Sequence, residues 1–447
     1  MNCIRLAFII LMIIIVLSLE QTRPYDMIMA KIRDLESKLL SKSSKMNDLS
    51  SLSIIESLAS AYSSLHMREQ SFELYERAFD IRKDLKLSTV SVSVALATEL
   101  QKMGKYNEAL LFVSNEMKKE QAIPDVESIL LRQEAHLLDC KGETFLALQK
   151  SMKAKNLDGK SGKSGSMSDL IQFLRLLRKV LIEEEVTKTI PTTIYDRLKK
   201  EWESMKKFLI DSGTFGNPLQ MPKSFVRGLR AQPWHSFESP LIPPSFPEFT
   251  PLIQLLEESS TYLLKEFLVL ETQNLLERED ECIHDSKQGS WKVFMCNAHW
   301  YKNVDDKGCS LSTPTACLVM QQAQDILTKM ESSSQVLRGG YSALNGNSHI
   351  RAHCGISNAQ LKLHVGLFAP IKLDGTPCAS LRVANETRSW KTGRVFVFDD
   401  SFEHEVWNSC DSNETLDGNS QRSVFQLVIS HPEMTSQTTS LEEREEL

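Results

Sequence analysis

The apolar positions follow two kinds of pattern in the two halves of the chain. Between about residues 54 and 154 they repeat, with Ala59, Ala97 and Ala135 spaced 38 residues apart and Gly104 and Gly142 equivalent in the turns. A small residue, a large apolar residue, a turn and a second small residue is the order in which paired helices pack in tetratricopeptide-like arrays. Such repeats have a period of about 34 residues, so generic helical hairpins are the alternative. Both interpretations predict an all-helical domain over residues 26–210.

Helical periodicity continues beyond the repeats. A Gly/Ser/Lys-rich stretch over residues 158–169 predicts a loop, and Ile194, Leu198 and Trp202 then recur at helical spacing after a break near Pro191. Eight prolines follow between residues 218 and 251, which predicts a connector over residues 211–250. A further helix is expected over residues 251–276.

Beyond Lys292 the sequence pattern changes to short β-rich runs. Four of these runs are separated by Gly, Pro, Asn and Asp, namely LKLHVGLF, ASLRVAN, RVFVFDD and RSVFQLVIS. Several short strands preceded by one helix indicate a double-sheet jelly roll, a double-stranded β-helix, over residues 251–440. The predicted fold class is therefore α+β, with helical repeats first and the jelly roll second.

Composition limits the partners and the compartment. A net charge of −6 and a pI near 6.0 argue against nucleic acid as a partner. Residues 1–20 contain an apolar run that reads as a secretory signal. The run from Leu6 to Leu19 has fourteen residues. As a helix it would cover only ~21 Å of a hydrocarbon core of about 30 Å, which favours a cleaved signal peptide over a signal anchor. Either route leads to an oxidising compartment where disulfides form.

Two histidines and an arginine form the strongest candidate site. His353 lies in SHIRAHCG and His404 in FEHEVWN, and Arg422 opens RSVFQLVIS. Two histidines on neighbouring strands can hold one Fe(II), because neutral imidazole suits iron and leaves coordination sites open. A downstream arginine can bind the far carboxylate of 2-oxoglutarate through two parallel hydrogen bonds. Gly355 stands where such sites commonly carry an Asp or Glu, two residues after the first histidine.

Longer motifs surround these residues. They are H-x-G-x-x-N (353–358), LHVGL (363–367), ANETRSW (384–390), FDDSFEHEVWN (398–408) and HPEMT (431–435). The run that they span resembles the catalytic domain of the aspartyl/asparaginyl β-hydroxylase family, and a fainter likeness extends upstream to about Trp234. The resemblance implies a dioxygenase that uses Fe(II), 2-oxoglutarate and O₂, with iron held by His353 and His404 only. It also implies a preceding helical domain and an N-terminal anchor in the endoplasmic reticulum membrane, as a single-pass type II protein.

The resemblance assigns further roles around the iron. Arg422 and Ser342 are expected to bind the distal carboxylate of 2-oxoglutarate, and His364 to approach it near the metal. Lys362 is expected beside the co-substrate, although it and Gln360 stand where the family has arginines. Lysine lacks the planar fork and glutamine lacks the charge, so the preference for Asp or Asn in the substrate is open. The alternative is that residues 360 and 362 lie on a solvated strand face.

Covalent features are also expected. By resemblance, Cys309 and Cys317 form a disulfide-closed loop near the substrate groove. Asn385 and Asn413 each open an N-x-T sequon, and Asn413 lies in the polar insertion between residues 409 and 421.

These features predict an enzyme, a peptidyl-aspartate/asparagine β-dioxygenase acting on secreted or membrane proteins in the lumen of the endoplasmic reticulum. By resemblance, the expected substrates carry epidermal-growth-factor-like (EGF-like) modules. Two alternatives are a lipid or small-molecule hydroxylase of the same family, and a repeat-based interaction protein with an inactive oxygenase domain.

Overall fold

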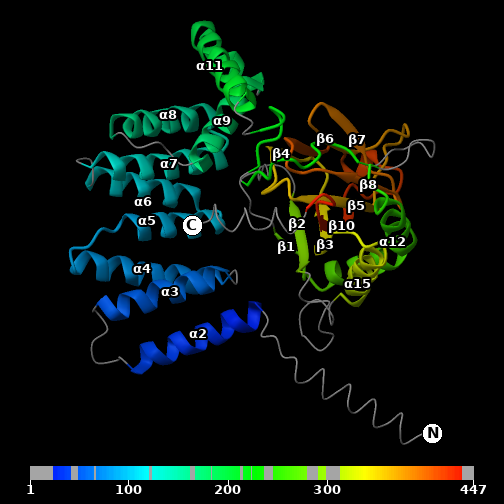
Figure 1. Cartoon of the computed structure of the whole chain (residues 1–447), viewed down its shortest axis with the longest axis horizontal. Helices are drawn as coiled ribbons and strands as arrows, with labels where there is room; N and C mark the ends of the chain where they lie inside the picture. Colours follow the sequence, from blue (N-terminus) through cyan, green and yellow to red (C-terminus); the bar gives the residue numbers. More distant parts are fainter. Residues whose placement is uncertain are drawn as a thin grey trace, which may run out of the picture. The chain divides into compact units, whose positions relative to one another are not determined.

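A computed structural model describes most of the chain in two compact units. The units are residues 1–126 and residues 127–447, and they are treated separately (Figure 1). Described residues are 24–41, 49–64, 67–119, 123–161, 167–182, 184–211, 215–222, 224–235, 245–278, 290–297 and 313–434. The predicted N-terminal signal lies outside these ranges. No helix within them combines the length and the apolar composition that a membrane span requires.

The first unit is built from consecutive helices. They are α2 (Pro24–Ser41), α3 (Leu49–Ser64), α4 (Arg68–Asp84), α5 (Val90–Lys102) and α6 (Tyr106–Lys119). Ala59 of α3 and Ala97 of α5 are fully buried, as the repeat predicts for the small residue between paired helices. Gly104 turns the chain from α5 to α6 with φ of 73°, a conformation in which a side chain is strained.

The second unit begins with the last part of the helical array. Its helices are α7 (Pro124–Cys140), α8 (Thr144–Ser161), α9 (Met167–Ile182), α10 (Glu184–Thr189) and α11 (Thr192–Asp211). The all-helical prediction and the break near Pro191 are confirmed. The loop predicted over residues 158–169 is wrong at both ends, because α8 continues to Ser161 and α9 begins at Met167. An ion pair between Asp158 and Arg132 of α7 holds the last turns of α8.

In the described part of the chain, ten strands form the two sheets of a jelly roll, and all the paired strands are antiparallel. The six-stranded sheet has the order β1 (Glu277–Arg278), β2 (Trp291–Asn297), β3 (Val336–Leu344), β10 (Arg422–Ser430), β5 (Gln360–Phe368) and β8 (Val395–Phe398). The four-stranded sheet has the order β4 (Ser348–His353), β9 (His404–Asn408), β6 (Ala379–Val383) and β7 (Glu386–Ser389). The four β-rich runs predicted from the sequence are β5, β6, β8 and β10.

Two helices cover the outer face of the six-stranded sheet, α12 (Phe249–Thr272) and α15 (Pro314–Lys329) (Figure 1). The buried Glu266 of α12 accepts hydrogen bonds from the Tyr341 hydroxyl, at 2.5 Å, and from the backbone N–H groups of Thr315 and Ala316, at 2.6 and 2.9 Å. It thereby satisfies the free N–H groups at the start of α15. Helix α15 was not predicted, because we expected only strands beyond Lys292.

The proline-rich segment packs along the sheets. Gln220 forms a bridge with Phe402, Ser224 with Ser357 and Trp234 with Phe398. The prolines exclude regular structure here, but the N–H and C=O groups between them still pair with the two sheets. The division into two compact units falls after Val126, in the first turn of α7.

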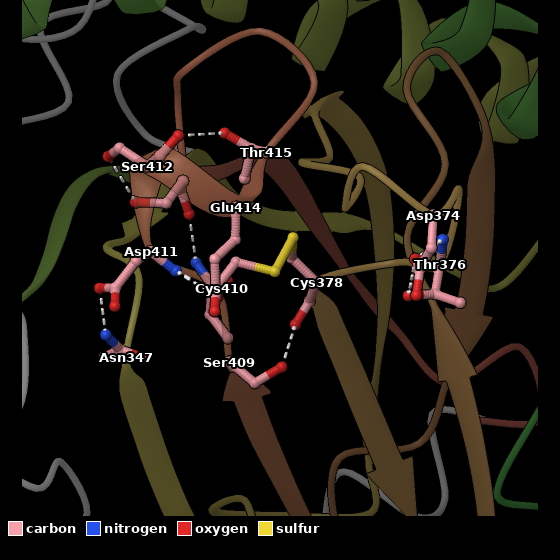
Figure 2. Close-up of a disulfide and its surroundings, with 12 residues drawn as sticks. Asn347, Asp374, Thr376, Cys378, Ser409, Cys410, Asp411, Ser412, Glu414 and Thr415 are labelled. Atoms are coloured by element: carbon pink, nitrogen blue, oxygen red, sulfur yellow. Dashed lines mark hydrogen bonds between the residues drawn. A yellow bond between two sulfur atoms is a disulfide. The ribbon is translucent and has the colours of Figure 1, made fainter.

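A disulfide joins Cys378, at the start of β6, to Cys410, just after β9 (Figure 2). Asp411 and Glu414 form a capping box directly after it, and the Asn347 side chain donates to Asp411. Sequence reasoning missed this pair, because cysteine spacing does not determine connectivity. Cys317 is also disulfide-bonded, but Cys309 lies outside the described residues, so their pairing stays a prediction.

Candidate functional site

The two candidate iron ligands face each other across neighbouring strands. His353 ends β4 and His404 begins β9, the two are paired in register, and their ring centroids lie 4.1 Å apart. The Nδ1 of His353 hydrogen-bonds to the Arg351 carbonyl at 2.7 Å, and the Nδ1 of His404 to the Phe402 carbonyl at 2.8 Å. A ring that donates its Nδ1–H to a carbonyl keeps Nε2 for a metal, as is usual for metal-binding histidines.

Burial keeps both imidazoles neutral. Desolvation, followed by the charge of nearby Lys362, lowers the pKa of His404 to about 3. Desolvation and the neighbouring His404 lower the pKa of His353 well below its usual value. The neutral ring is the form that binds metal, so no proton has to leave at physiological pH.

Asp400 lies against Gly355, the position at which such sites commonly carry a third iron ligand. The Gly355 N–H donates to the Asp400 backbone carbonyl at 2.6 Å, and a Cβ on Gly355 would lie 2.5 Å from the Asp400 carboxylate. The residue therefore has to be glycine because Asp400 approaches so closely. A left-handed backbone is not the reason, since Gly355 is not among the glycines with positive φ.

Lys362 forms an ion pair with Asp400, with 2.9 Å between Nζ and Oδ2. Its side chain is 20% exposed and that of Asp400 only 3%. The alternative that residue 362 lies on a solvated strand face is therefore wrong. The other carboxylate oxygen of Asp400, Oδ1, is buried without a hydrogen-bond partner among the described residues.

The strand register places the remaining candidates on one face of the six-stranded sheet. Ser342 of β3 pairs with Val424 of β10, and Arg422 lies two residues before Val424. His364 of β5 pairs with Gln426, and Lys362 with Val428. Paired residues, and residues two apart on a strand, point to the same side of a sheet. Ser342, Arg422, His364 and Lys362 therefore share the face that looks toward the four-stranded sheet, as does Gln360.

Arg422 is a buried cation with no carboxylate partner among the described residues. The residue is 2% exposed, its guanidinium lies 4.8 Å from the Trp390 ring centroid, and burial lowers its pKa to about 9. No carboxylate pairs with it in the described part of the chain, where its Nε is buried without a hydrogen-bond partner. Charges are rarely buried alone, because each costs several kcal/mol of desolvation. This arrangement suits an anionic ligand.

Other polar groups beside Arg422 also lack partners. Trp390 Nε1 and both ring nitrogens of His364 are buried without hydrogen bonds among the described residues. Burial and the charge of Lys362 lower the pKa of His364, so its ring is neutral. The Ser342 Oγ accepts a hydrogen bond from Trp291 Nε1 at 3.0 Å, which leaves its own proton to donate. Buried polar groups normally have hydrogen-bond partners, so the unpaired nitrogens of Trp390 and His364 fit a polar ligand.

His349, a nearby histidine that is not an expected iron ligand, and the two sequon asparagines lie away from this face. His349 pairs with Glu405 at 3.2 Å and stacks on Trp407 with 5.3 Å between ring centroids. Asn385 and Asn413 are both exposed, as a glycan would require.

The donor set fits the predicted iron and co-substrate. Two neutral imidazoles suit Fe(II). A buried arginine on the neighbouring sheet suits the carboxylate of an oxoacid. Asp400 and Trp390 were not among the predicted site residues, although both fall within the motifs. Their neighbours in space come from other strands, so no spacing along the chain marks them.

An antiparallel jelly roll with a histidine pair, and with an arginine that has no carboxylate partner among the described residues, is the arrangement expected of an oxygenase-type domain. Residues 257–432 match the family model described as Aspartyl/Asparaginyl beta-hydroxylase. The chain is 31% identical over 229 residues to the aspartyl/asparaginyl beta-hydroxylase of Mus musculus and 30% identical to that of Homo sapiens. Residues 257–432 are therefore a domain of the aspartyl/asparaginyl β-hydroxylase family.

The likeness to these relatives is partial. The two matches cover 50% of this chain but only 27% and 26% of the relatives, so the chain spans about a quarter of their length. The ornithine lipid ester-linked acyl 2-hydroxylase of Rhizobium tropici is 29% identical over 127 residues, which are 28% of this chain and 39% of that protein.

Among solved structures, the TPR-like repeats of a kinesin light chain from Podosopora anserina are 13% identical, with a TM-score of 0.31, covering 40% of this chain and 87% of that one.

Proposed function

We propose that the chain is an Fe(II)- and 2-oxoglutarate-dependent dioxygenase that hydroxylates the β-carbon of Asp or Asn residues in secreted or membrane proteins. The observation that carries the proposal is the buried Arg422, which has no carboxylate partner in the described residues and shares a sheet face with Ser342 and His364. Its charge is balanced if a dicarboxylate binds there, within the same domain as the histidine pair.

Each residue has a defined task in this proposal. Iron, with 2-oxoglutarate and O₂, supplies the oxidation of the substrate C–H bond when bound. His353 and His404 hold the metal through Nε2, while the Arg351 and Phe402 carbonyls fix the two rings. Arg422 and Ser342 orient the distal carboxylate of the co-substrate. The apolar residues between the sheets, such as Phe398 and Val424, exclude water from the reacting groups.

The polypeptide substrate is proposed from the relatives. The proteins from mouse and human named above are aspartyl/asparaginyl hydroxylases, and we extend this to EGF-like modules. Gln360 is neutral and its buried Nε2 has no hydrogen-bond partner among the described residues. A neutral donor favours an amide over a second carboxylate, because it adds no charge to stabilise one. We therefore infer a preference for Asn over Asp.

The disulfide supports an oxidising compartment as the cellular setting. Cys378 and Cys410 are bonded, and such bonds persist in oxidising compartments. We propose the lumen of the endoplasmic reticulum as the location. The same proposal includes an N-terminal membrane anchor, with a cleaved signal peptide as the alternative. The predicted signal lies outside the described residues.

A lipid acyl chain is the second candidate substrate. The acyl 2-hydroxylase of Rhizobium tropici matches this chain over 127 residues, which supports it. The alternative of an inactive interaction protein has no comparable support, since an unpaired buried arginine destabilises a fold that has no ligand for it.

The test is a mass measurement of candidate substrates. EGF-like peptides with a central Asn or Asp, and an ornithine lipid, are each incubated with the full chain, Fe(II), 2-oxoglutarate and O₂, with His404→Ala as the matched control. The expected result is one added oxygen on the peptide, faster for Asn, together with equimolar succinate. Oxygen added only to the lipid would select the second candidate. Absence of succinate with every substrate would contradict the dioxygenase proposal.

A further inference from the structure

Helix α7 contacts the strand that carries the first histidine. The Arg351 guanidinium donates to the backbone carbonyls of Asp139 and Cys140, at 3.3 and 3.1 Å, at the C-terminal end of α7. The last carbonyls of a helix lack partners within it, and this end of the helix dipole attracts cations. The carbonyl of the same Arg351 fixes the His353 ring. One residue therefore connects the end of α7 to a candidate ligand.

The turn after α7 is shaped around this contact. Gly142 has φ of 81°, and a Cβ added there would lie 3.4 Å from the Arg351 guanidinium. Asp139 also accepts two hydrogen bonds of 2.8 Å from Lys179 of α9, so α7 and α9 are linked beside the contact.

Helix α9 contacts the strand that carries the second histidine. Glu403 directly precedes His404, and its carboxylate pairs with Arg178 of α9 at 3.3 Å and with Arg382 of β6 at 3.2 Å. The Glu403 side chain is only 7% exposed. Two cations from different elements therefore hold the backbone next to His404.

The proline-rich segment hydrogen-bonds both to α9 and to the residues that precede β9. Arg175 of α9 donates to the Met221 carbonyl from two nitrogens, at 3.2 and 2.7 Å. The Glu403 N–H donates to the Leu219 carbonyl at 2.7 Å, and Gln220 donates to Asp399 at 3.1 Å. Helix, connector and strand thus form one hydrogen-bonded assembly around the residues that flank both histidines.

We propose that Arg351 and Arg178 are positioning residues of the metal centre, through which α7 and α9 set the arrangement of His353 and His404 and hence the metal affinity. The proposal rests on the proposed function, because it requires a metal at this histidine pair. The contacts of Arg351 and Arg178 lie within one compact unit, which contains the sheets and the helices from Glu127 onward. A site with only two protein ligands depends strongly on their arrangement, and groups that orient metal ligands typically contribute about 10- to 100-fold in affinity.

The test uses Co(II), which binds histidine sites and has visible absorption bands that report coordination geometry. The full-length protein is titrated with Co(II) under anaerobic conditions, and the variants are Arg351→Ala, Arg351→Lys and Arg178→Ala. Arg394→Ala is the matched control, since Arg394 forms an ion pair of 2.9 Å with Glu257 of α12, away from the histidines. We expect Co(II) affinity to fall about 10- to 100-fold in Arg351→Ala, with an altered spectrum, and less in Arg178→Ala. Arg351→Lys should recover part of the affinity, because lysine can still donate to one carbonyl.

Each remaining outcome has a defined meaning. Wild-type affinity and spectrum in Arg351→Ala would overturn the proposal, as would an equal loss of affinity in Arg394→Ala. If Arg351→Ala does not fold, Arg351→Lys decides, and a Co(II) affinity and spectrum identical to wild type would then reject the positioning role. Failure of the wild-type protein to bind Co(II), or undiminished binding by His404→Ala, would contradict the proposed function itself.

Discussion

The carboxylate of Asp400 occupies the space into which a side chain at Gly355 would extend. A Cβ there would lie 2.5 Å from both the Cγ and an oxygen of Asp400. The same carboxylate is paired with Lys362. The position of the usual third ligand is thus closed by a neighbouring acid, whose own Oδ1 has no hydrogen-bond partner among the described residues.

The substitution Gly355→Asp should therefore lower turnover, even though it adds a potential iron ligand. The new carboxylate would displace Asp400 and separate it from Lys362, and overpacking of this kind costs about 1–3 kcal/mol. We expect turnover to fall about tenfold or more, measured as succinate formation beside iron content.

The control is the double variant Gly355→Asp/Asp400→Ala, in which the space has been cleared. It should bind more iron than Gly355→Asp alone, because the new carboxylate no longer competes with Asp400 for space. Turnover of Gly355→Asp at or above the wild-type level would show that the absent third ligand is incidental.

The two histidine substitutions should have opposite outcomes. His404→Ala should abolish succinate formation, because a single remaining protein ligand holds a labile ion poorly. His349→Ala should retain most of the activity, because His349 contacts Glu405 and Trp407 and faces away from the pair. The measurement is succinate release at saturating Fe(II), and a reversed order would reject the ligand assignment.

Arg422→Ala should raise the 2-oxoglutarate requirement more than it affects folding. A charged hydrogen-bonded contact contributes about 1.5–3 kcal/mol, or roughly 10- to 150-fold in affinity. Removing an unpaired buried cation should leave the fold at least as stable, since its desolvation cost is also removed. Arg394→Ala serves as the control for loss of a surface arginine, and an unchanged co-substrate dependence would exclude Arg422 from the site.

Removal of the Cys378–Cys410 disulfide should lower stability. The bond joins residues separated by 32 positions, and closing a loop of this length removes chain entropy from the unfolded state that corresponds to about 3–4 kcal/mol. The double variant Cys378→Ser/Cys410→Ser should therefore unfold at a lower urea concentration than the wild type. A loss below about 1 kcal/mol would mean that the surrounding contacts in Figure 2, including the Ser409 and Asn347 hydrogen bonds, hold the loop without the bond.

Acid should destabilise the protein through His235. Its ring is fully buried and stacks on Phe246, and desolvation, with the nearby His431 and Arg230, lowers its pKa to about 3. The unfolded chain takes up a proton near pH 6.5 while the folded chain does not, so stability is full above pH 6.5 and falls as pH decreases toward 3. Protonation of His235 in the unfolded chain should alone lower the free energy of unfolding by about 1.4 kcal/mol at pH 5.5.

The variant His235→Phe keeps an aromatic ring at this position without the titrating group. The difference between its unfolding free energies at pH 7.5 and pH 5.5 should be smaller than the wild-type difference by about this amount. Equal differences would indicate that His235 takes up its proton without unfolding.

Local patterns were sufficient for most of the secondary structure. Ala59, Ala97 and Ala135 occupy equivalent buried positions in α3, α5 and α7, because each repeat packs the same face of its first helix. Alternation in LKLHVGLF and the short apolar, β-branched run in RSVFQLVIS mark two of the strands. Helix α15 was not predicted because we expected only strands beyond Lys292, and its first N–H groups are satisfied by Glu266, 49 residues from Thr315.

The sequence by itself determined that His353, His404 and Arg422 are the residues to examine, since the motifs around them are local. Only the tertiary structure decided that Asp400 closes the space beside Gly355, that Arg422 has no carboxylate partner in the described chain, and that Arg351 reaches the end of α7. The physical reason is one of range. Periodicity along the chain is set by the geometry of each element, whereas burial, charge pairing and close approach are set by which distant elements pack together.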